Sequence, residues 1–334
     1  MSNTSKQEHS VSIIIPFYNE EGNIFRMVDR VHDVLADYIY PWELVLVNDG
    51  SIDKTQDELQ QAVEKYGKHV NVVELQRNFG QTAAMQAGID EAQGSILITL
   101  DGDMQNDPAD IPNMVQTFIE KDLDLLVGWR QKRKDKLILR KIPSLIANRL
   151  IGKVTGVYMH DYGCSFKVYR ASVIKKVRLY GEMHRFIPAW VASVVPAHRI
   201  AEQVVTHHER TVGESKYGIS RTFRVLLDLL SVWFFMRFKA RPGHFFGSIG
   251  LILGALGTLI FAWLGFDKFI LGEDIGTRPL LMIGIVMIVA SMQFITTGVL
   301  AEFMSRIYFG NSDQKSYTLR DEPDDKERVW YQAK

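Results

Sequence analysis

Two long uncharged stretches near the C-terminus limit the fold of this chain the most. Residues 245–266 and 280–301 each run for 22 residues without a charged side chain. As helices rising 1.5 Å per residue they would be about 33 Å long, enough to cross a hydrocarbon core of about 30 Å. Buried helices of a large soluble protein are the alternative. We predict a two-helix transmembrane region over 242–304, followed by a tail at 305–334.

Charge is distributed unevenly along the 334 residues, although the net charge is zero. Residues 1–129 carry a net charge of −14 and residues 130–241 a net charge of +16. An acidic lobe suits a metal ion, and a basic lobe suits anions or an anionic membrane surface. A chain without net positive charge is not typical of a nucleic-acid binder. The single cysteine, Cys164, excludes an internal disulfide framework.

Basic residues on either side of the two spans predict the orientation in the membrane. Arg237, Lys239 and Arg241 precede the first span, and Arg306 follows the second. By the positive-inside rule we expect a multi-pass protein of the inner (plasma) membrane with both termini in the cytoplasm. The polar residues 1–10 form an N-terminal tail without the apolar core of a signal peptide.

Residues 221–241 differ from the two spans. The polar residues Arg221, Arg224, Asp228 and Ser231 recur at steps of three and four, and nearly every other residue is apolar. This spacing is typical of a helix that lies in the membrane interface, with a core helix as the alternative. Within the spans, Gly250 and Gly254 form a GxxxG pair that suits a helix contact.

Residues 11–129 alternate between short apolar runs and longer amphipathic segments. We expect strands at Val11–Ile15, Leu44–Val47, Val70–Leu75, Ile96–Leu100 and Leu123–Val127, with helices at 20–37, 53–66, 81–93 and 108–121. Asp107 followed by Pro108 is a favourable start for the last helix. Repeated strand–helix units predict an α/β fold with a mostly parallel, Rossmann-like sheet, whose ligands bind at the carboxyl ends of the strands.

Polar residues gather where these strands end. The fourth strand is followed by Asp101-Gly102-Asp103, and two carboxylates so placed can both reach one Mg²⁺ or Mn²⁺ ion. A DxD in an ordinary exposed loop is the alternative. Asp49 follows the second strand, where it either binds a ligand or caps the next helix. Dinucleotide and P-loop glycine motifs are absent from the sequence.

Several longer motifs resemble one family. They are IIIPFYNEE, LVNDGSIDKT, LQRNFGQTAAMQAG, ITLDGDMQNDP, HDYGCSFKVYR and HHERTVGESKYG, and they cover most of residues 11–220. The chain resembles the family-2, inverting, GT-A-fold polyprenyl-phosphate glycosyltransferases, such as dolichyl-phosphate mannose synthases, bactoprenol glucosyltransferases and aminoarabinose-type transferases. The resemblance implies a glycosyltransferase domain over 11–220. A QxxRW motif of processive synthases is absent, which agrees with the transfer of a single sugar.

The resemblance also implies where a nucleotide-sugar donor binds. Donor binding is expected from Pro16, Tyr18, Glu20, Asp49, Asn78, Gln81 and Asp101. Asp101 and Asp103, with Gln105 as a further ligand, would hold Mg²⁺ or Mn²⁺ on the donor diphosphate. Such a metal neutralises charge on the leaving nucleoside diphosphate, which makes Asp103 a catalytic residue as well.

The basic lobe is expected to bind the acceptor. Arg140 and Arg149 match arginines that bind the acceptor phosphate in relatives, and Pro143–Gly156 has the pattern of a membrane-surface helix. Residues that bind the acceptor phosphate or the diphosphate would then be Arg140, Arg149, Arg210, Ser215 and Lys216. A solvated charge run is the alternative, and it is the interpretation we favour for residues 130–136. The adjacent His207 and His208 lack the spacing of metal ligands.

Asp161 occupies the position of the general base in relatives that glycosylate hydroxyl groups. A lipid phosphate has a second pKa of about 6 and is largely dianionic at neutral pH, so it needs no strong base. We therefore expect Asp161 to orient a substrate, with base catalysis as the weaker alternative.

Taken together, the sequence predicts a metal-dependent hexosyltransferase that moves one sugar from a nucleotide donor to a polyprenyl phosphate such as undecaprenyl phosphate. The two-span architecture resembles that of bacterial transferases that use UDP-sugars, so we expect a UDP-sugar donor in preference to GDP-mannose. Transfer to another lipid such as diacylglycerol, and a non-catalytic role in lipid-linked sugar transport, are the alternatives. The sequence does not determine which sugar is transferred, nor whether the protein forms a homo-oligomer through its membrane helices.

Overall fold

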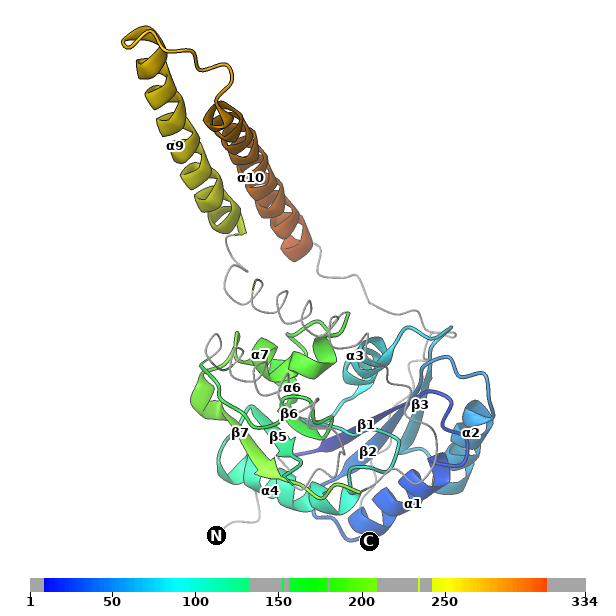
Figure 1. Cartoon of the computed structure of the whole chain (residues 1–334). Coiled ribbons are helices and arrows are strands. Elements are labelled where there is room, and N and C mark those ends of the chain that lie inside the picture. Colours follow the sequence, from blue (N-terminus) through cyan, green and yellow to red (C-terminus); the bar gives the residue numbers. More distant parts are fainter. Residues whose placement is uncertain are drawn as a thin grey trace. The chain divides into compact units, whose positions relative to one another are not determined.

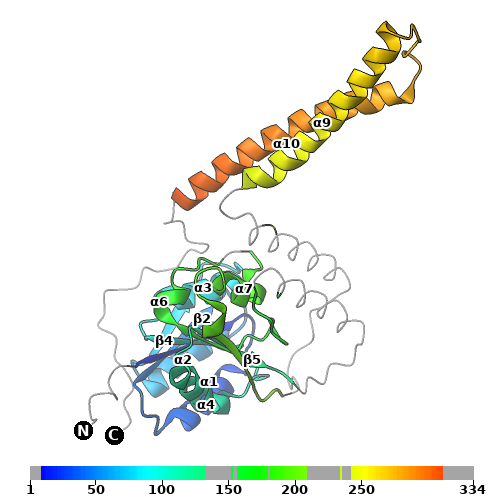
Figure 2. The same cartoon turned by 90° about the vertical axis from the view of Figure 1, so that its left-hand side faces the viewer.

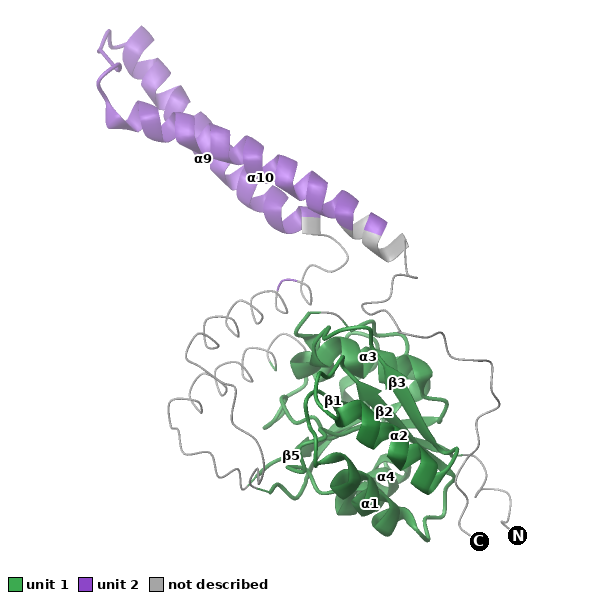
Figure 3. Cartoon of the chain, turned by 90° about the vertical axis from the view of Figure 1, so that its right-hand side faces the viewer, with its two compact units in different colours: residues 1–233, 315–334 green, residues 234–314 purple. Residues whose placement is uncertain are grey.

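The structure, a computed structural model, describes residues 9–131, 152, 156–179, 181–208, 234 and 242–310. The chain divides into two compact units, one comprising residues 1–233 and 315–334 and the other residues 234–314 (Figure 3). The division falls inside the interfacial helix expected at 221–241, which lies outside the described residues apart from Phe234.

The first unit is built on a seven-stranded sheet. Its strands are β1 (Val11–Phe17), β2 (Trp42–Asn48), β3 (Val70–Glu74), β4 (Ile96–Thr99), β5 (Leu125–Trp129), β6 (Lys167–Arg170) and β7 (Ile200–Val204). They lie in the order β3-β2-β1-β4-β6-β5-β7. All neighbouring pairs are parallel except that β6 runs antiparallel to both β4 and β5. The expected mostly parallel sheet is confirmed.

Helices cover both faces of this sheet. Figures 1 and 2 show α1 (Ile24–Leu35), α2 (Thr55–Tyr66) and α4 (Ile111–Glu120) on one face, and α3 (Gln81–Glu91), α6 (Ala171–Ile174) and α7 (Ile187–Val191) on the other. Short 3₁₀ turns lie at η1 (Pro108–Asp110), η2 (Met183–Phe186) and η3 (Ala197–Arg199). Because both faces are covered, β2 is buried along its whole length, including its polar residues Glu43 and Asn48.

Local sequence signals placed these elements well. All five expected strands are present, and the four expected helices are found within or close to their expected ranges. The Asp107 carboxylate accepts a hydrogen bond from the backbone N–H of Ala109 at 3.0 Å, so the predicted cap is confirmed on η1, which leads into α4. The strands β6 and β7 were not among the expected ones.

An ion cluster joins the three strands at one side of the sheet. Asp124, which directly precedes β5, is buried between Arg170 of β6 and Arg199, which precedes β7. One carboxylate oxygen of Asp124 lies 2.7 Å from Nε of Arg170, and the other lies 2.7 Å from Nε of Arg199. The exposed Asp122 contacts the same two guanidinium groups at 2.7 and 3.1 Å. The cluster therefore fixes the starts of β5 and β7 against the end of β6.

The second unit is a helical hairpin of α9 (Pro242–Phe269) and α10 (Pro279–Gly310). The segments Gly243–Phe269 and Pro279–Met304 each have a mean hydropathy of 2.1 and are long enough to cross a bilayer. Less than a fifth of each apolar window is buried, which is unlike the core helix of a soluble protein. We therefore assign the hairpin to a membrane.

Small residues allow α9 and α10 to approach closely. A Cβ on Gly250 would lie 2.7 Å from a side-chain carbon of Ile295, and one on Gly254 would lie 2.7 Å from the hydroxyl of Ser291. The Ser291 hydroxyl donates a 2.6 Å hydrogen bond to the carbonyl of Gly250. The GxxxG pair therefore serves a helix contact within one chain, as small residues commonly do in membranes.

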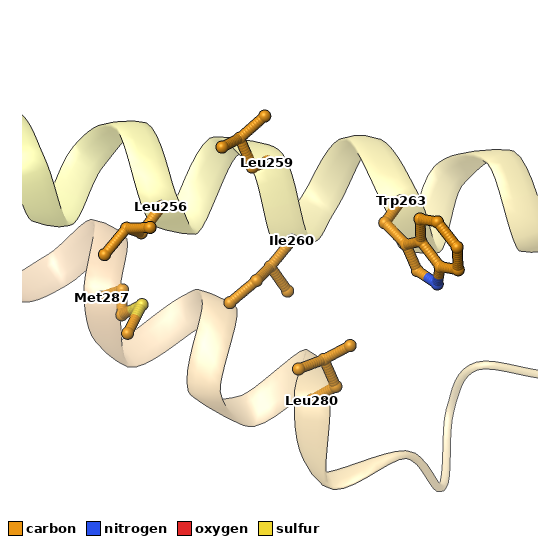
Figure 4. A pocket seen from close by; sticks show the side chains of 6 residues that line it. All are labelled: Leu256, Leu259, Ile260, Trp263, Leu280 and Met287. Carbon is orange, nitrogen blue, oxygen red and sulfur yellow. The ribbon is translucent and has the colours of Figure 1, made fainter.

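Nearer the connecting loop, the two helices border an open apolar groove of about 330 Å³. Figure 4 shows the six side chains that line it: Leu256, Leu259, Ile260, Trp263, Leu280 and Met287. None of them carries a charge, so the groove suits contact with hydrocarbon. The loop beyond it is fixed by Arg278, which pairs with Asp267 and Glu273.

Candidate active site

Three loops converge at the carboxyl ends of β1, β2 and β4. β1 ends at Phe17 and β2 at Asn48, and these two residues are direct partners in the parallel register. β4 ends at Thr99, which pairs with Ile14 of β1. The loops that follow carry Tyr18 and Glu20, Asp49, and Asp101 and Asp103, so the sheet brings most of the expected donor-binding residues to one edge.

Asp49 is held by a further loop, the one between β3 and α3. One oxygen of its buried carboxylate accepts the backbone N–H of Phe79 at 2.8 Å, and the other accepts the N–H of Gly80 at 3.0 Å and the side-chain amide of Asn78 at 3.1 Å. Burial raises the pKa of Asp49, and the two backbone N–H groups oppose this. Asp49 therefore fixes the loop that precedes α3; it does not cap α2, the helix that follows it.

The adjoining turns are tightly fitted. Gly50 has a φ of +62°, and a Cβ there would lie 2.2 Å from the backbone of Arg77, so only glycine fits. Asn19, with a φ of 50°, receives a hydrogen bond on its side chain from Ile52 and donates its own N–H to Ser51 at 3.0 Å. These contacts hold the loops after β1 and β2 together.

Asp101 and Asp103 follow β4 directly. The Gln81 side-chain amide, at the start of α3, donates to Asp101 at 2.8 Å, and Asp103 accepts the N–H of Gln105 at 3.2 Å. Burial and then the neighbouring Asp103 raise the pKa of Asp101. Between them, a Cβ on Gly102 would lie 2.3 Å from the Phe17 ring, which explains why the middle residue is glycine.

The donor set of this loop fits a hard divalent cation that also binds phosphates. Among the described residues, no group of three or more His, Cys, Asp or Glu side chains is placed to hold a metal. Asp101 and Asp103 offer two carboxylates whose charges repel each other, which a cation would relieve. Mg²⁺ and Mn²⁺ are commonly bound by one or two carboxylates with substrate phosphates completing the shell, and this loop offers that arrangement.

The Asp101–Asp103 loop is also held by hydrogen bonds to residues further along the chain. The backbone carbonyl of Gln105 accepts the N–H of His208 at 2.8 Å, and Asn106 forms an isolated antiparallel bridge with His207. The buried Asn106 amide donates to the Ser165 hydroxyl at 2.9 Å. The segment at 205–208 is thus joined to the Asp101–Asp103 loop.

Arg130 and Asp161 form a paired group beside this loop. The guanidinium of Arg130, directly after β5, donates to both carboxylate oxygens of Asp161 at 2.7 and 2.9 Å. Their side chains are only 12% and 15% exposed. The expectation of a solvated charge run was therefore wrong for Arg130. The Asp161 pairing raises the pKa of Arg130 further above its usual range, in spite of burial.

The structure does not describe every expected residue of the site. Arg140, Arg149, Arg210, Ser215 and Lys216 lie outside the described residues, as does most of Pro143–Gly156. Sequence analysis missed Arg130 as a member of the site, together with Asn106 and Lys167. A signal for Arg130 was its position directly after an apolar strand, where the other site residues also stand.

The fold agrees with solved structures of GT-A glycosyltransferases. Crystal structures of glucosyl-3-phosphoglycerate synthase from Mycobacterium tuberculosis, one with phosphoglyceric acid and one with Mn²⁺ and UDP-glucose, superpose with TM-scores of 0.52 and 0.51 at 17% identity. The superpositions cover 67% of this chain and 80% and 79% of the other. At this identity they show the fold alone, so the first unit is a GT-A-type α/β domain.

Sequence comparison gives the family. Residues 12–178 match the description "Glycosyl transferase family 2", and the chain belongs to this family of enzymes. A dodecaprenyl-phosphate galacturonate synthase from Rhizobium johnstonii is 59% identical over 98% of this chain and 97% of its own length. An undecaprenyl-phosphate 4-deoxy-4-formamido-L-arabinose transferase from Photorhabdus laumondii is 33% identical over 91% of both.

Proposed function

We propose that this glycosyltransferase transfers one galacturonic acid residue from a UDP-sugar to a polyprenyl phosphate at the cytoplasmic face of a membrane. The observation that carries the proposal is the 59% identity to the galacturonate synthase over nearly the full length of both chains. It refines the expectation from sequence, which left the sugar open. The Asp101–Asp103 loop and the membrane hairpin supply the two features that such a reaction needs, a place for a diphosphate and an anchor near the lipid.

In the proposed reaction an oxygen of the acceptor phosphate attacks the anomeric carbon of the sugar. A new carbon–oxygen bond forms, and the bond between that carbon and the donor diphosphate breaks. The nucleoside diphosphate leaves with the electron pair, and attack from the opposite side inverts the anomeric centre. An acceptor phosphate that is already dianionic loses no proton in this step.

The residues divide this work between two groups. The loops carrying Tyr18, Glu20 and Asn78 border the donor side, and Gln81 orients Asp101 through its 2.8 Å hydrogen bond. A divalent cation, Mg²⁺ or Mn²⁺, held by Asp101 and Asp103 with Gln105 nearby, would neutralise charge on the leaving diphosphate. Asp161 accepts two hydrogen bonds from the single guanidinium of Arg130. We therefore assign Asp161 to orienting a substrate and not to base catalysis.

Acceptor binding is assigned to arginines of the basic lobe. Arg130 also lies at this edge of the sheet, but its guanidinium is already bidentate with Asp161, so we assign it to holding Asp161 and not to the acceptor phosphate. Arg140 and Arg149, with Arg210, Ser215 and Lys216, remain proposed contacts to the acceptor phosphate or the diphosphate. We also propose that both termini lie in the cytoplasm and that the protein forms a homo-oligomer through its membrane helices.

A donor panel tests the proposal. Full-length protein in detergent is incubated with undecaprenyl or dodecaprenyl phosphate, Mg²⁺ or Mn²⁺, and radiolabelled UDP-galacturonate, UDP-glucuronate, UDP-glucose or UDP-4-deoxy-4-formamido-L-arabinose. We expect a charged, mild-acid-labile lipid product with UDP-galacturonate. Preference for the formamido sugar would favour the function of the 33% identical relative. Transfer to diacylglycerol in place of polyprenyl phosphate, or no transfer from any donor, would refute the proposal.

A further inference from the structure

A lysine is buried in the middle of the sheet, directly beneath the site. Lys167 is the first residue of β6 and is 1% exposed. It pairs with Thr99 of β4 on one side and with Val127 of β5 on the other. β4 leads into Asp101 and β5 leads into Arg130. Lys167 therefore lies between the two strands that carry these site residues.

The Lys167 ammonium supports the loop that connects Asp161 to β6. It donates a hydrogen bond to the carbonyl of Cys164. The next residue, Ser165, accepts a bond from the Thr99 hydroxyl on its carbonyl at 2.7 Å and one from the Asn106 amide on its own hydroxyl at 2.9 Å. Lys167 therefore helps to hold residues 161–165 against the Asp101–Asp103 loop.

Charges of both signs act on Lys167. Asp161 and Asp101 are the carboxylates that act on it, and Arg130, which is paired with Asp161, is the cation. Burial lowers the pKa of Lys167, and the charges of Asp161 and Asp101 oppose that shift. An ammonium removed from water is costly unless negative charge compensates it, and the site carboxylates provide that charge.

We propose that Lys167 is a positioning residue of the transfer site: its ammonium group, held at the Cys164 carbonyl, offsets the negative charge of Asp101 and Asp161 and thereby limits the affinity of the site for a free divalent cation. This inference rests on the proposed function, because it takes the Asp101–Asp103 loop as the cation site. A cation bound weakly by the protein alone is held chiefly when a donor diphosphate contributes its own oxygens. Release of the nucleoside diphosphate would then also release the cation.

The test measures Mn²⁺ binding, which needs no turnover. Mn²⁺ is titrated against full-length protein in detergent, with and without UDP, and free Mn²⁺ is followed by electron paramagnetic resonance. Lys167→Met removes both the charge and the bond to Cys164, whereas Lys167→Gln removes the charge and keeps an N–H donor. We expect both variants to bind Mn²⁺ about five- to tenfold more tightly than wild type, since a nearby positive charge repels the ion.

Thr99→Val is the matched control. It removes a hydrogen bond to the same loop, at Ser165, without changing any charge, so damage to the loop alone would leave Mn²⁺ affinity unchanged or weaken it. Unchanged or weaker Mn²⁺ binding in the Lys167 variants would overturn the inference. If Lys167→Met does not fold, Lys167→Gln decides by itself. Wild-type protein that binds Mn²⁺ but transfers no sugar would instead contradict the proposed function.

Discussion

Asp124 and Asp122 offer a direct test of how burial sets the strength of an ion pair. Both carboxylates contact the same two guanidinium groups, those of Arg170 and Arg199. The Asp124 side chain is 7% exposed, whereas that of Asp122 is 74% exposed. Asp124→Asn and Asp122→Asn each replace one carboxylate by an amide of the same shape, so the two variants differ mainly in solvent access.

The structure predicts unequal losses of stability. In Asp124→Asn the side-chain oxygen of the amide still accepts a hydrogen bond from Arg170 or from Arg199, but the NH₂ group cannot accept one from the other arginine. Both guanidinium groups then lack their buried counter-charge. Removing one partner of a buried pair costs about 3–5 kcal/mol, and we take about 3 kcal/mol because both arginines are about one-third exposed. Asp122→Asn removes an exposed pair, worth about 0.5 kcal/mol.

Thermal unfolding of the full-length protein in detergent, followed by tryptophan fluorescence, measures the difference. For a unit of this size, 1 kcal/mol shifts Tm by about 2–4 °C. Asp124→Asn should therefore lower Tm by about 6–12 °C and Asp122→Asn by about 1–2 °C. Equal shifts in the two variants, or a larger shift for Asp122→Asn, would refute the argument from burial.

Three further outcomes are expected. Asp103→Asn should abolish sugar transfer while leaving Tm near that of wild type, because the diphosphate cation loses a charged ligand; near-wild-type turnover at saturating Mn²⁺ would contradict this assignment. Gly250→Ala should lower the temperature at which the protein aggregates in detergent, since its Cβ meets Ile295, whereas Gly265→Ala, with open space around it, should not. Burial, and then the charge of His32, lower the pKa of His69 to about 4 from an ordinary 6.5, so the neutral ring stabilises the fold above pH 6.5 and that stability is lost as the pH falls towards 4. The loss is on the order of 2–3 kcal/mol. Urea unfolding at several pH values between 7 and 4 measures it: the free energy of unfolding should fall less steeply with decreasing pH in His69→Phe than in wild type.

Features that depend on neighbouring residues could be predicted from the sequence. Each membrane helix follows from an uninterrupted apolar stretch, and each of the first five strands from a short apolar run. The Asp107 cap and the position of Asp101 and Asp103 at the end of a strand are equally local. Once a parallel sheet was expected, the convergence of these loops at one edge followed from the geometry of strand–helix units.

The tertiary structure alone decided which distant residues meet. β6 enters between β4 and β5 in the antiparallel sense, and no local pattern indicates that insertion. This placement buries Lys167 and brings Asp161 to Arg130, 31 residues earlier, so that an arginine in a basic run became half of a nearly buried pair. Likewise the Asp49 carboxylate binds a loop 30 residues further on. A long polar side chain can be solvated or can pair with a buried group. The register of the strands determines which of these two environments it has.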